Sequence, residues 1–148
     1  MFSQEMKELF GLLFIVENRL TTACEKIQTE ISMKQWLLLA LVMTQADSQT
    51  LTELGKLMGC SRQNIKKLAL ALEQKGLVQL KEGPRKSYDI QVLPKAYELA
   101  DQMALRHETT LRLLFSDFSQ QEIQIFHRLY SKLEINIKKV EDYANEMD

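Results

Sequence analysis

A short run of polar side chains near the middle of the sequence has the chemistry to recognise a nucleic acid. Its members are Arg62, Gln63, Asn64, Lys66 and Lys67. Cations of this kind bind phosphates, and amides such as those of Gln63 and Asn64 can pair with base edges in a major groove. Such contacts are usually made from the first turns of a helix that enters the groove. The run is therefore a candidate DNA-contacting surface, provided that it lies at the start of a helix.

Start and stop signals predict a helix over residues 61–76. Ser61 is a good N-cap, because its hydroxyl can accept from a first-turn amide that otherwise lacks a partner. Gly76 supplies the left-handed residue that commonly follows a helix. The apolar residues of the segment share one side at helical spacing, and they are Ile65, Leu68, Ala69 and Leu72. The polar run projects away from this stripe, so we predict a recognition helix.

The residues before this helix predict a helix-turn-helix. Thr50 and Glu53 have the spacing of a capping box, which opens a short helix that ends at Gly59. Only Gly59 and Cys60 then separate this helix from Ser61. Two short helices with such a link are typical of a helix-turn-helix, although a plain helical hairpin has the same pattern.

The residues after the helix predict a β-hairpin. Residues 76–81 and 87–92 alternate apolar and polar side chains, as strands do. The turn between them contains Gly83 and Pro84 and carries two cations, Arg85 and Lys86. A hairpin with a basic tip directly after a recognition helix is a wing. We expect its cations to contact the minor groove or the flanking backbone.

Charge is distributed unevenly along the chain. The 148 residues carry a net charge of −1, yet residues 61–86 contain seven basic groups against two acidic ones. Local charge decides whether a surface attracts a polyanion, so the near-neutral total does not exclude DNA.

Several other classes of protein lack support in the sequence. We find no Gly-rich phosphate loop and no paired nucleophile and base, so we expect no enzyme and no cofactor. Cys24, Cys60, His107 and His127 do not have metal-ligand or disulfide spacing. The longest apolar run, residues 36–43, is far below the roughly 20 residues that cross a bilayer. We therefore expect a single-domain, cytosolic, reduced protein without a membrane segment.

Long helices are predicted on both sides of the winged-helix segment. The N-terminal helix, residues 3–28, is apolar on more than one face. Further helices begin at Ser32 and Ser119, each with a capping box, and at Pro94. In the last helix apolar residues recur at alternating spacings of three and four, and they are Ile123, Phe126, Tyr130, Leu133, Ile137, Val140 and Ala144. This heptad seam could pack on the chain's own first helix, but we favour a seam shared by the two chains of a dimer.

The fold class is therefore mostly α with a small β-hairpin wing: a winged helix-turn-helix core flanked by N- and C-terminal dimerisation helices. The order of elements and several motifs resemble the MarR family of transcription regulators. The matching residues are 35–39 (QWLLL), 54–63 (LGKLMGCSRQ), 72–78 (LEQKGLV), 94–95 (PK) and 98–101 (ELAD).

The resemblance implies a homodimer, more often a repressor, that straddles a pseudo-palindromic operator in double-stranded DNA. Residues 1–30 and 94–148 would form the dimerisation helices, and residues 32–93 the DNA-binding lobe. The implied DNA contacts are Ser61, Arg62, Gln63, Asn64, Lys66, Lys67, Arg85 and Lys86. Such regulators commonly respond to a small aromatic or carboxylate effector, or to thiol oxidation. For Cys60, which lies just before a helix, we favour a packing role over redox sensing.

Two alternatives differ from this interpretation. A winged helix can serve as a protein–protein adaptor, which would bind DNA weakly and without sequence preference. A small-molecule enzyme in the dimer cleft is the other, although the sequence offers no catalytic group.

Overall fold

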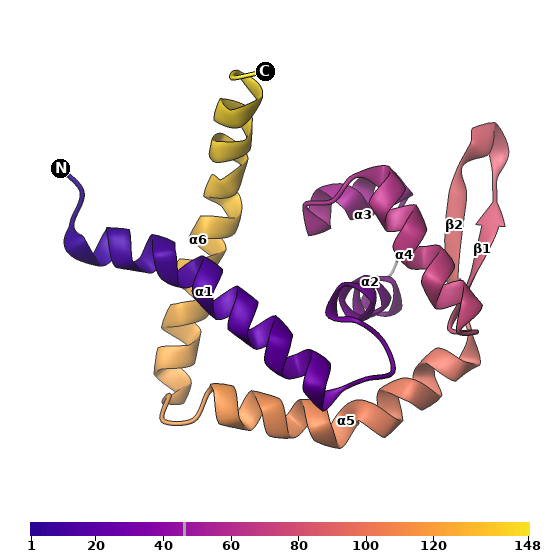
Figure 1. The fold of residues 1–148 in the computed structure, drawn as a ribbon, viewed down its shortest axis with the longest axis horizontal. Helices are drawn as coiled ribbons and strands as arrows, with labels where there is room; N and C mark the ends of the chain where they lie inside the picture. Colours follow the sequence, from indigo (N-terminus) through magenta and orange to yellow (C-terminus); the bar gives the residue numbers. More distant parts are fainter. Residues whose placement is uncertain (46) are drawn as a thin grey trace. The chain divides into compact units, whose positions relative to one another are not determined.

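The computed structural model describes residues 1–45 and 47–148, which divide into two compact units, Met1–Arg106 and His107–Asp148 (Figure 1). The first unit contains α1 (Gln4–Ile27), α2 (Met33–Thr44), α3 (Leu51–Met58), α4 (Arg62–Gln74), β1 (Val78–Glu82), the 3-10 turn η1 (Pro84–Lys86), β2 (Tyr88–Val92) and the beginning of α5 (Pro94–Leu114). The second contains the end of α5 and then α6 (Gln120–Asn145). The predicted fold class, mostly helical with one small hairpin, is confirmed.

Side-chain caps begin the helices close to the predicted residues. Four serine hydroxyls each accept a hydrogen bond from the amide three residues later, and these are Ser3, Ser32, Ser61 and Ser119. The predicted box at Thr50 is only half formed. The Thr50 hydroxyl accepts from the Glu53 amide at 3.1 Å and donates to the Glu53 carboxylate, also at 3.1 Å. That carboxylate is thus bound to the hydroxyl, and no bond from the Thr50 amide completes the box.

A hydrophobic core joins α2, α3, α4 and the hairpin. Its fully buried side chains include Leu38, Leu54, Ile65, Leu72 and Val78. We predicted that the apolar run in α2 is buried on all sides. In the structure Leu38 and Leu39 are buried, whereas Leu37 is 40% exposed. The helix is central to the core, but one side of it faces outward.

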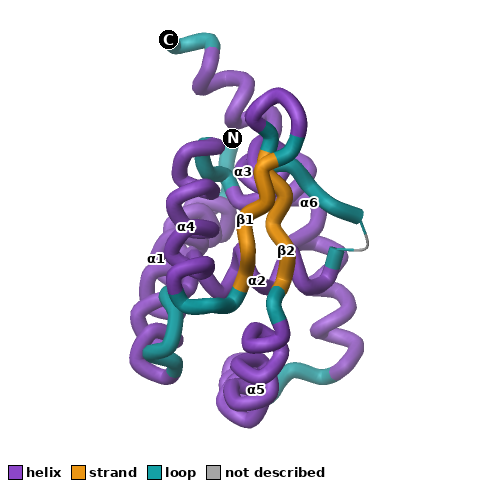
Figure 2. The backbone as a smooth tube through the Cα atoms, turned by 90° about the vertical axis from the view of Figure 1, so that its right-hand side faces the viewer, coloured by secondary structure: helices purple, strands orange, loops and turns teal. Residues whose placement is uncertain are grey.

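The wing is an antiparallel two-stranded ladder beside α4 (Figure 2). Val78 pairs with Val92, Leu80 with Ile90, and Glu82 with Tyr88. Val78 and Ile90 are buried in the core. The hairpin is therefore fixed by apolar packing near its base, and its last rung before the tip is Glu82 with Tyr88.

The terminal helices bury almost nothing in the single chain. Neither α1 nor α6 contains a buried residue. In α1 the side chains of Phe10 and Phe14 are 67% and 58% exposed. Along the predicted heptad seam of α6, Phe126, Tyr130, Leu133, Ile137 and Val140 are 45–59% exposed. These helices form where they were predicted, but their apolar sides are not covered.

An aromatic cluster closes the turn that links α5 and α6 in the second unit. The ring of Phe118 lies 5.9 Å from that of Phe115 and 6.2 Å from that of Phe126, both edge-to-face. Asp117 adopts a left-handed φ of 66°, which lets the chain reverse within a few residues. Across the described residues, no helix has both the length and the apolarity needed to span a bilayer.

Candidate nucleic-acid interface

The turn between α3 and α4 is tight, and two glycines make it so. Gly59 ends α3 with a left-handed φ of +71°, which favours glycine. Gly55 lies under the turn, where an added Cβ would be 2.6 Å from the carbonyl oxygen of Cys60. The backbone of the turn can approach α3 this closely only because Gly55 has no side chain. This close approach fixes where the first turn of α4 begins.

The first turn of α4 presents the predicted polar side chains to the outside. The hydroxyl of Ser61 accepts from the Asn64 amide at 3.1 Å. The exposed residues in this stretch are Ser61, Arg62, Gln63, Asn64 and Lys67. On the opposite side Ile65, Ala69 and Leu72 are buried. The predicted division into an inner apolar stripe and an outer polar edge is therefore present.

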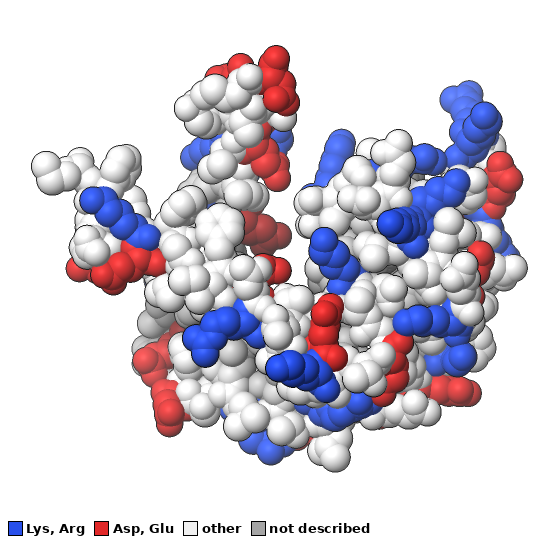
Figure 3. All heavy atoms as spheres, in the orientation of Figure 1, with Lys and Arg blue, Asp and Glu red and all other residues white. Residues whose placement is uncertain are grey.

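The tip of the wing presents two exposed cations in an unusual backbone conformation. Arg85 and Lys86 have φ angles of 60° and 58°, in the left-handed region that residues with a Cβ rarely adopt. The Gly83 amide donates to the Ser87 carbonyl at 2.8 Å and closes the tip. Lys and Arg side chains gather over α4 and at this tip (Figure 3). The tip and the start of α4 thus carry charge of the same sign.

Polar bonds link α4 to the wing, and the sequence did not predict them. A guanidinium nitrogen of Arg62, Nη2, donates to the Lys86 carbonyl at 3.2 Å. Lys66 is half-buried, and its Nζ lies 3.2 Å from the Tyr88 hydroxyl and 4.4 Å from the centre of the Tyr88 ring.

A third bond lies farther along α4. The carboxylate of Glu73 accepts from the Leu80 amide of β1 at 2.7 Å. Arg62, Lys66 and Glu73 are separated by four and seven residues, which places them on one side of a helix. This spacing was visible in the sequence, but its hairpin partners were not.

No known family profile matches this sequence, and no curated protein sequence matches it either. Solved structures do match. A MarR-family regulator from Rhodococcus sp. RHA1 has a TM-score of 0.76 at 22% identity, over 88% of this chain and 96% of that chain. A MarR-family protein from Bacillus stearothermophilus has a TM-score of 0.70 at 23% identity, over 93% of this chain and 99% of that one. CouR from Rhodococcus jostii RHA1, bound to p-coumaroyl-CoA, has a TM-score of 0.75 at 20% identity, over 88% and 95%.

The chain has the MarR fold. The likeness extends beyond the winged helix, since the shared coverage of both chains is at least 88% in each comparison. The structural likeness therefore includes parts of the flanking helices. In the sequence, these helices resembled the family only in the order of the elements.

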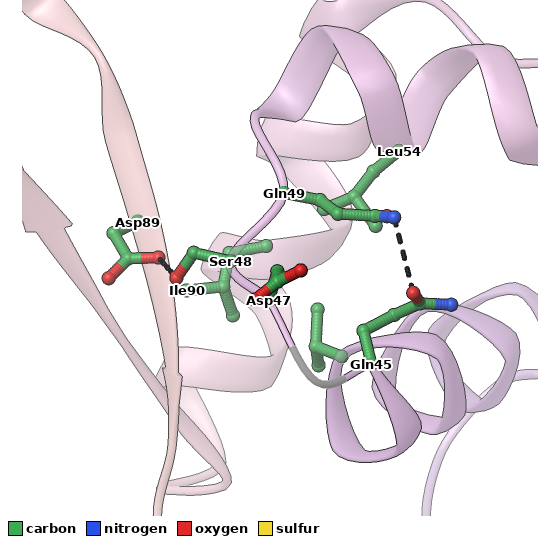
Figure 4. Close-up of a pocket in the computed structure, with 8 residues that line it drawn as sticks. Gln45, Asp47, Ser48, Gln49, Leu54, Asp89 and Ile90 are labelled. Carbon is green, nitrogen blue, oxygen red and sulfur yellow. Dashed lines mark hydrogen bonds between the residues drawn. The ribbon is translucent and has the colours of Figure 1, made fainter.

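Two hollows of this MarR fold differ in their lining. The first lies beside β2, where the Ser48 hydroxyl donates to the Asp89 carboxylate at 2.8 Å and the Gln49 amide donates to Gln45 at 3.3 Å (Figure 4). The carboxylates of Asp47 and Asp89 line it, so it is poorly suited to an anion. The bond between Ser48 and Asp89 also ties the residues just before α3 to β2 of the wing.

The second hollow, of about 430 Å³, lies between the end of α4 and the start of α5. Its lining includes apolar Ile31, Leu77 and Leu99 together with the cations Lys75 and Lys95. The ammonium of Lys75 donates to the Glu30 carbonyl at 2.7 Å, and that of Lys95 donates to the Lys75 carbonyl at 2.8 Å. The carboxylates of Glu30 and Glu98 also line this hollow, so it differs from the first one in its apolar floor and in the two cations that balance its two acidic groups.

The ion pair next to this second hollow fixes the connection between α1 and α2. Arg106 of α5 lies 2.5 Å from the Glu30 carboxylate and also donates to the Ile27 carbonyl at 3.0 Å. The hydrogen bond from Arg106 lowers the pKa of Glu30 below its ordinary value. The middle of α5 is thereby tied to the segment that leads into α2.

The two cysteines are free thiols of intermediate burial. Cys60 packs against the core of the lobe, and its Sγ lies 3.8 Å from the Met58 carbonyl. This placement agrees with the packing role that we favoured. Across the described residues, no group of three or more His, Cys, Asp or Glu side chains could hold a metal ion.

Proposed function

We propose that the chain is a homodimeric transcriptional regulator that binds a pseudo-palindromic operator in duplex DNA, and we favour a repressor over an activator. The observation that carries the proposal is the joint exposure of the first turn of α4 and the cationic wing tip, which Arg62 links at 3.2 Å. Two basic surfaces that are linked in this way can contact a major groove and the phosphates beside it. Residues 32–93 would then form the DNA-binding lobe.

Individual side chains take different roles in this proposal. Gln63, Asn64 and Lys67 would read base edges, because they are exposed on the outer side of α4. Ser61, Arg62, Arg85 and Lys86 would contact phosphates or the minor groove. Arg62 can do so while bound to the wing, since a guanidinium has several donors and only one is used by Lys86. Lys66 was also predicted to contact DNA, but it is half-buried with its ammonium against the Tyr88 ring.

Dimerisation by residues 1–30 and 94–148 is supported by the apolar sides that the single chain leaves open. Exposed apolar surface of this extent marks an interaction site more often than free surface. In α6 the open residues recur at the heptad spacing that suits a second helix. Two lobes held in this way would address half-sites about one helical turn apart, roughly 34–36 Å.

Selection of bound sequences from a pool of random duplexes tests the proposal directly. We expect enrichment of a pseudo-palindrome. A protein–protein adaptor with the same fold would retain DNA weakly and without a preferred sequence. A pool that shows no enrichment after several rounds would contradict the proposal and favour the adaptor.

A double variant tests the assigned surface. Arg62→Ala with Lys67→Ala should weaken binding to the selected duplex, with about 1–3 kcal/mol lost at the base pair that Lys67 reads. The matched control is Lys34→Ala with Lys139→Ala, which also removes two exposed cations but outside the proposed surface. Equal affinity of the double variant and the parent would contradict the assignment.

A small carboxylate effector is a further part of the proposal. It is supported by the apolar floor and the cations Lys75 and Lys95 of the second hollow, and by a structural neighbour, BpsR of Bordetella bronchiseptica, whose DNA binding is regulated by 6-hydroxynicotinic acid, a small aromatic carboxylate. Screening aromatic carboxylates for release of the selected duplex would identify such a ligand. If no release occurs at millimolar concentrations, this part is contradicted.

A further inference from the structure

The wing needs an attachment to α4 beyond its apolar base. A two-stranded hairpin by itself is only marginally stable in water. The buried residues Val78 and Ile90 hold it to the core, but from Lys81 to Ser87 every residue except the half-buried Gly83 is exposed. Apolar packing therefore does not extend to the tip.

Two contacts from α4 reach the outer half of the wing. The Lys66 ammonium meets Tyr88, which occupies the last rung of the ladder, and Arg62 donates to the Lys86 carbonyl at the tip itself. Arg62 and Lys66 are one turn apart on α4, so the contacts follow one another along the wing. They form a polar seam between the recognition helix and the hairpin.

Lys66 differs from its neighbour Lys67 in what surrounds it. Lys67 is exposed, whereas Lys66 is half-buried with its ammonium 4.4 Å from the centre of the Tyr88 ring. The ring attracts the cation through its quadrupole, and the hydroxyl of Tyr88, 3.2 Å away, is a further partner. The ammonium of Lys66, half-buried against this ring, is therefore less available to a phosphate than that of the exposed Lys67.

We propose that Lys66 and Tyr88 are positioning residues that hold the wing at a fixed distance from α4. The start of α4 and the tip cations then meet DNA as one preformed surface, and less conformational entropy is lost on binding. Lys66 thus acts through Tyr88 and does not contact a phosphate. This inference rests on the proposed function for its DNA-binding consequence, but the geometry of the free wing can be tested without DNA.

The first measurement uses the free protein. Backbone ¹⁵N relaxation at Gly83, Arg85 and Lys86 reports the order of the wing tip on the picosecond–nanosecond timescale. We expect lower order parameters in Lys66→Met and in Tyr88→Leu, and parental values in the control Lys67→Met. Parental order in Lys66→Met, or equal loosening by Lys67→Met, would overturn the proposal. The result holds even if the parent binds no duplex, an outcome that would contradict only the proposed function.

The second measurement is a double-mutant cycle in DNA binding over a range of salt concentrations. We expect Lys66→Met and Tyr88→Leu each to weaken binding by about three- to tenfold, and the double variant to be no weaker than either, because both remove one contact. The salt dependence should stay parental, whereas loss of a phosphate contact lowers its slope by about one. Lys66→Arg should restore binding, since guanidinium also stacks on an aromatic ring. A lower slope in Lys66→Met with parental affinity in Tyr88→Leu would overturn the proposal.

Discussion

The winged-helix lobe and the terminal helices both carry apolar stripes, but only the lobe buries them in the single chain. In the lobe, Leu54 and Ile65 are fully buried and the capped helices enclose their own core. In α1 and α6 no residue is buried, although both helices carry long apolar sides. Helical periodicity tells which side of a helix is apolar, but not which surface covers it. The lobe completes its packing within one chain, whereas the apolar sides of the terminal helices stay exposed.

The largest effect is expected from a substitution that disrupts the proposed dimer contact of α6. Ile137, at the centre of the seam, is 51% exposed in the single chain. Ile137→Asp would bury a carboxylate twice in a symmetric dimer, because each chain contributes one copy. We expect dimer affinity to fall by about 100-fold or more, measured by analytical ultracentrifugation.

A matched variant distinguishes the seam from the rest of α6. Lys139→Asp also introduces a carboxylate on α6, but outside the heptad positions, and it should leave the dimer intact. Circular dichroism should show that the lobe stays folded in both variants, since its core lies elsewhere. An Ile137→Asp protein that sediments like the parent would show that the apolar side of α6 does not join two chains.

The next largest effect is expected on the free energy of unfolding, when a glycine of the lobe and a glycine of α1 are each replaced by alanine. Gly55→Ala places a Cβ against the Cys60 carbonyl, where only a backbone shift could relieve a 2.6 Å contact. We expect a loss of about 1–3 kcal/mol in the free energy of unfolding. Gly11 of α1 has no atom within 4 Å of an added Cβ. Gly11→Ala should therefore stabilise α1 by roughly 0.5–1 kcal/mol. Urea denaturation measures both, and a tolerated Gly55→Ala would refute the tight-turn explanation.

The smallest expected effect concerns acid stability. Arg106 lowers the pKa of Glu30 in the folded chain, so Glu30 contributes stability above its unfolded pKa and loses it as the pH falls through the folded value. The side chains are 35% and 34% exposed, and solvent screening limits the contribution to less than about 1 kcal/mol.

Glu30→Gln should therefore unfold at a lower urea concentration than the parent at pH 7. The two proteins should converge as the solution is acidified through the lowered pKa of Glu30, because the parent carboxyl is then protonated as well. A difference that persists unchanged in acid would mean that the glutamine acts through packing and not through lost charge.

Local signals predicted most of the fold. Ser61, Gly59 and Gly76 marked the ends of helices because capping and left-handed φ angles depend on neighbouring residues alone. These local signals failed to predict hydrogen bonds where a side chain had more than one possible partner. Glu53 had the spacing of a capping box, yet its carboxylate is bound to the Thr50 hydroxyl.

The candidate site was predictable on α4 but not across to the wing. The periodicity of α4 separated its outer edge from its buried stripe. It could not show that Lys66 meets Tyr88, because those residues are 22 positions apart and come together only when the hairpin docks on the helix. The roles of the exposed residues remain predictions, since they depend on a partner that the chain does not contain.

The left-handed wing tip has a consequence for how this protein responds to selection in the laboratory. Arg85 and Lys86 each hold a conformation that disfavours residues with a Cβ by about 1–2 kcal/mol, and glycine carries no such penalty. A screen for thermostability alone should therefore enrich Arg85→Gly or Lys86→Gly. Either substitution would discard a cation from the proposed DNA surface, so gains in heat resistance at the tip would come with weaker binding.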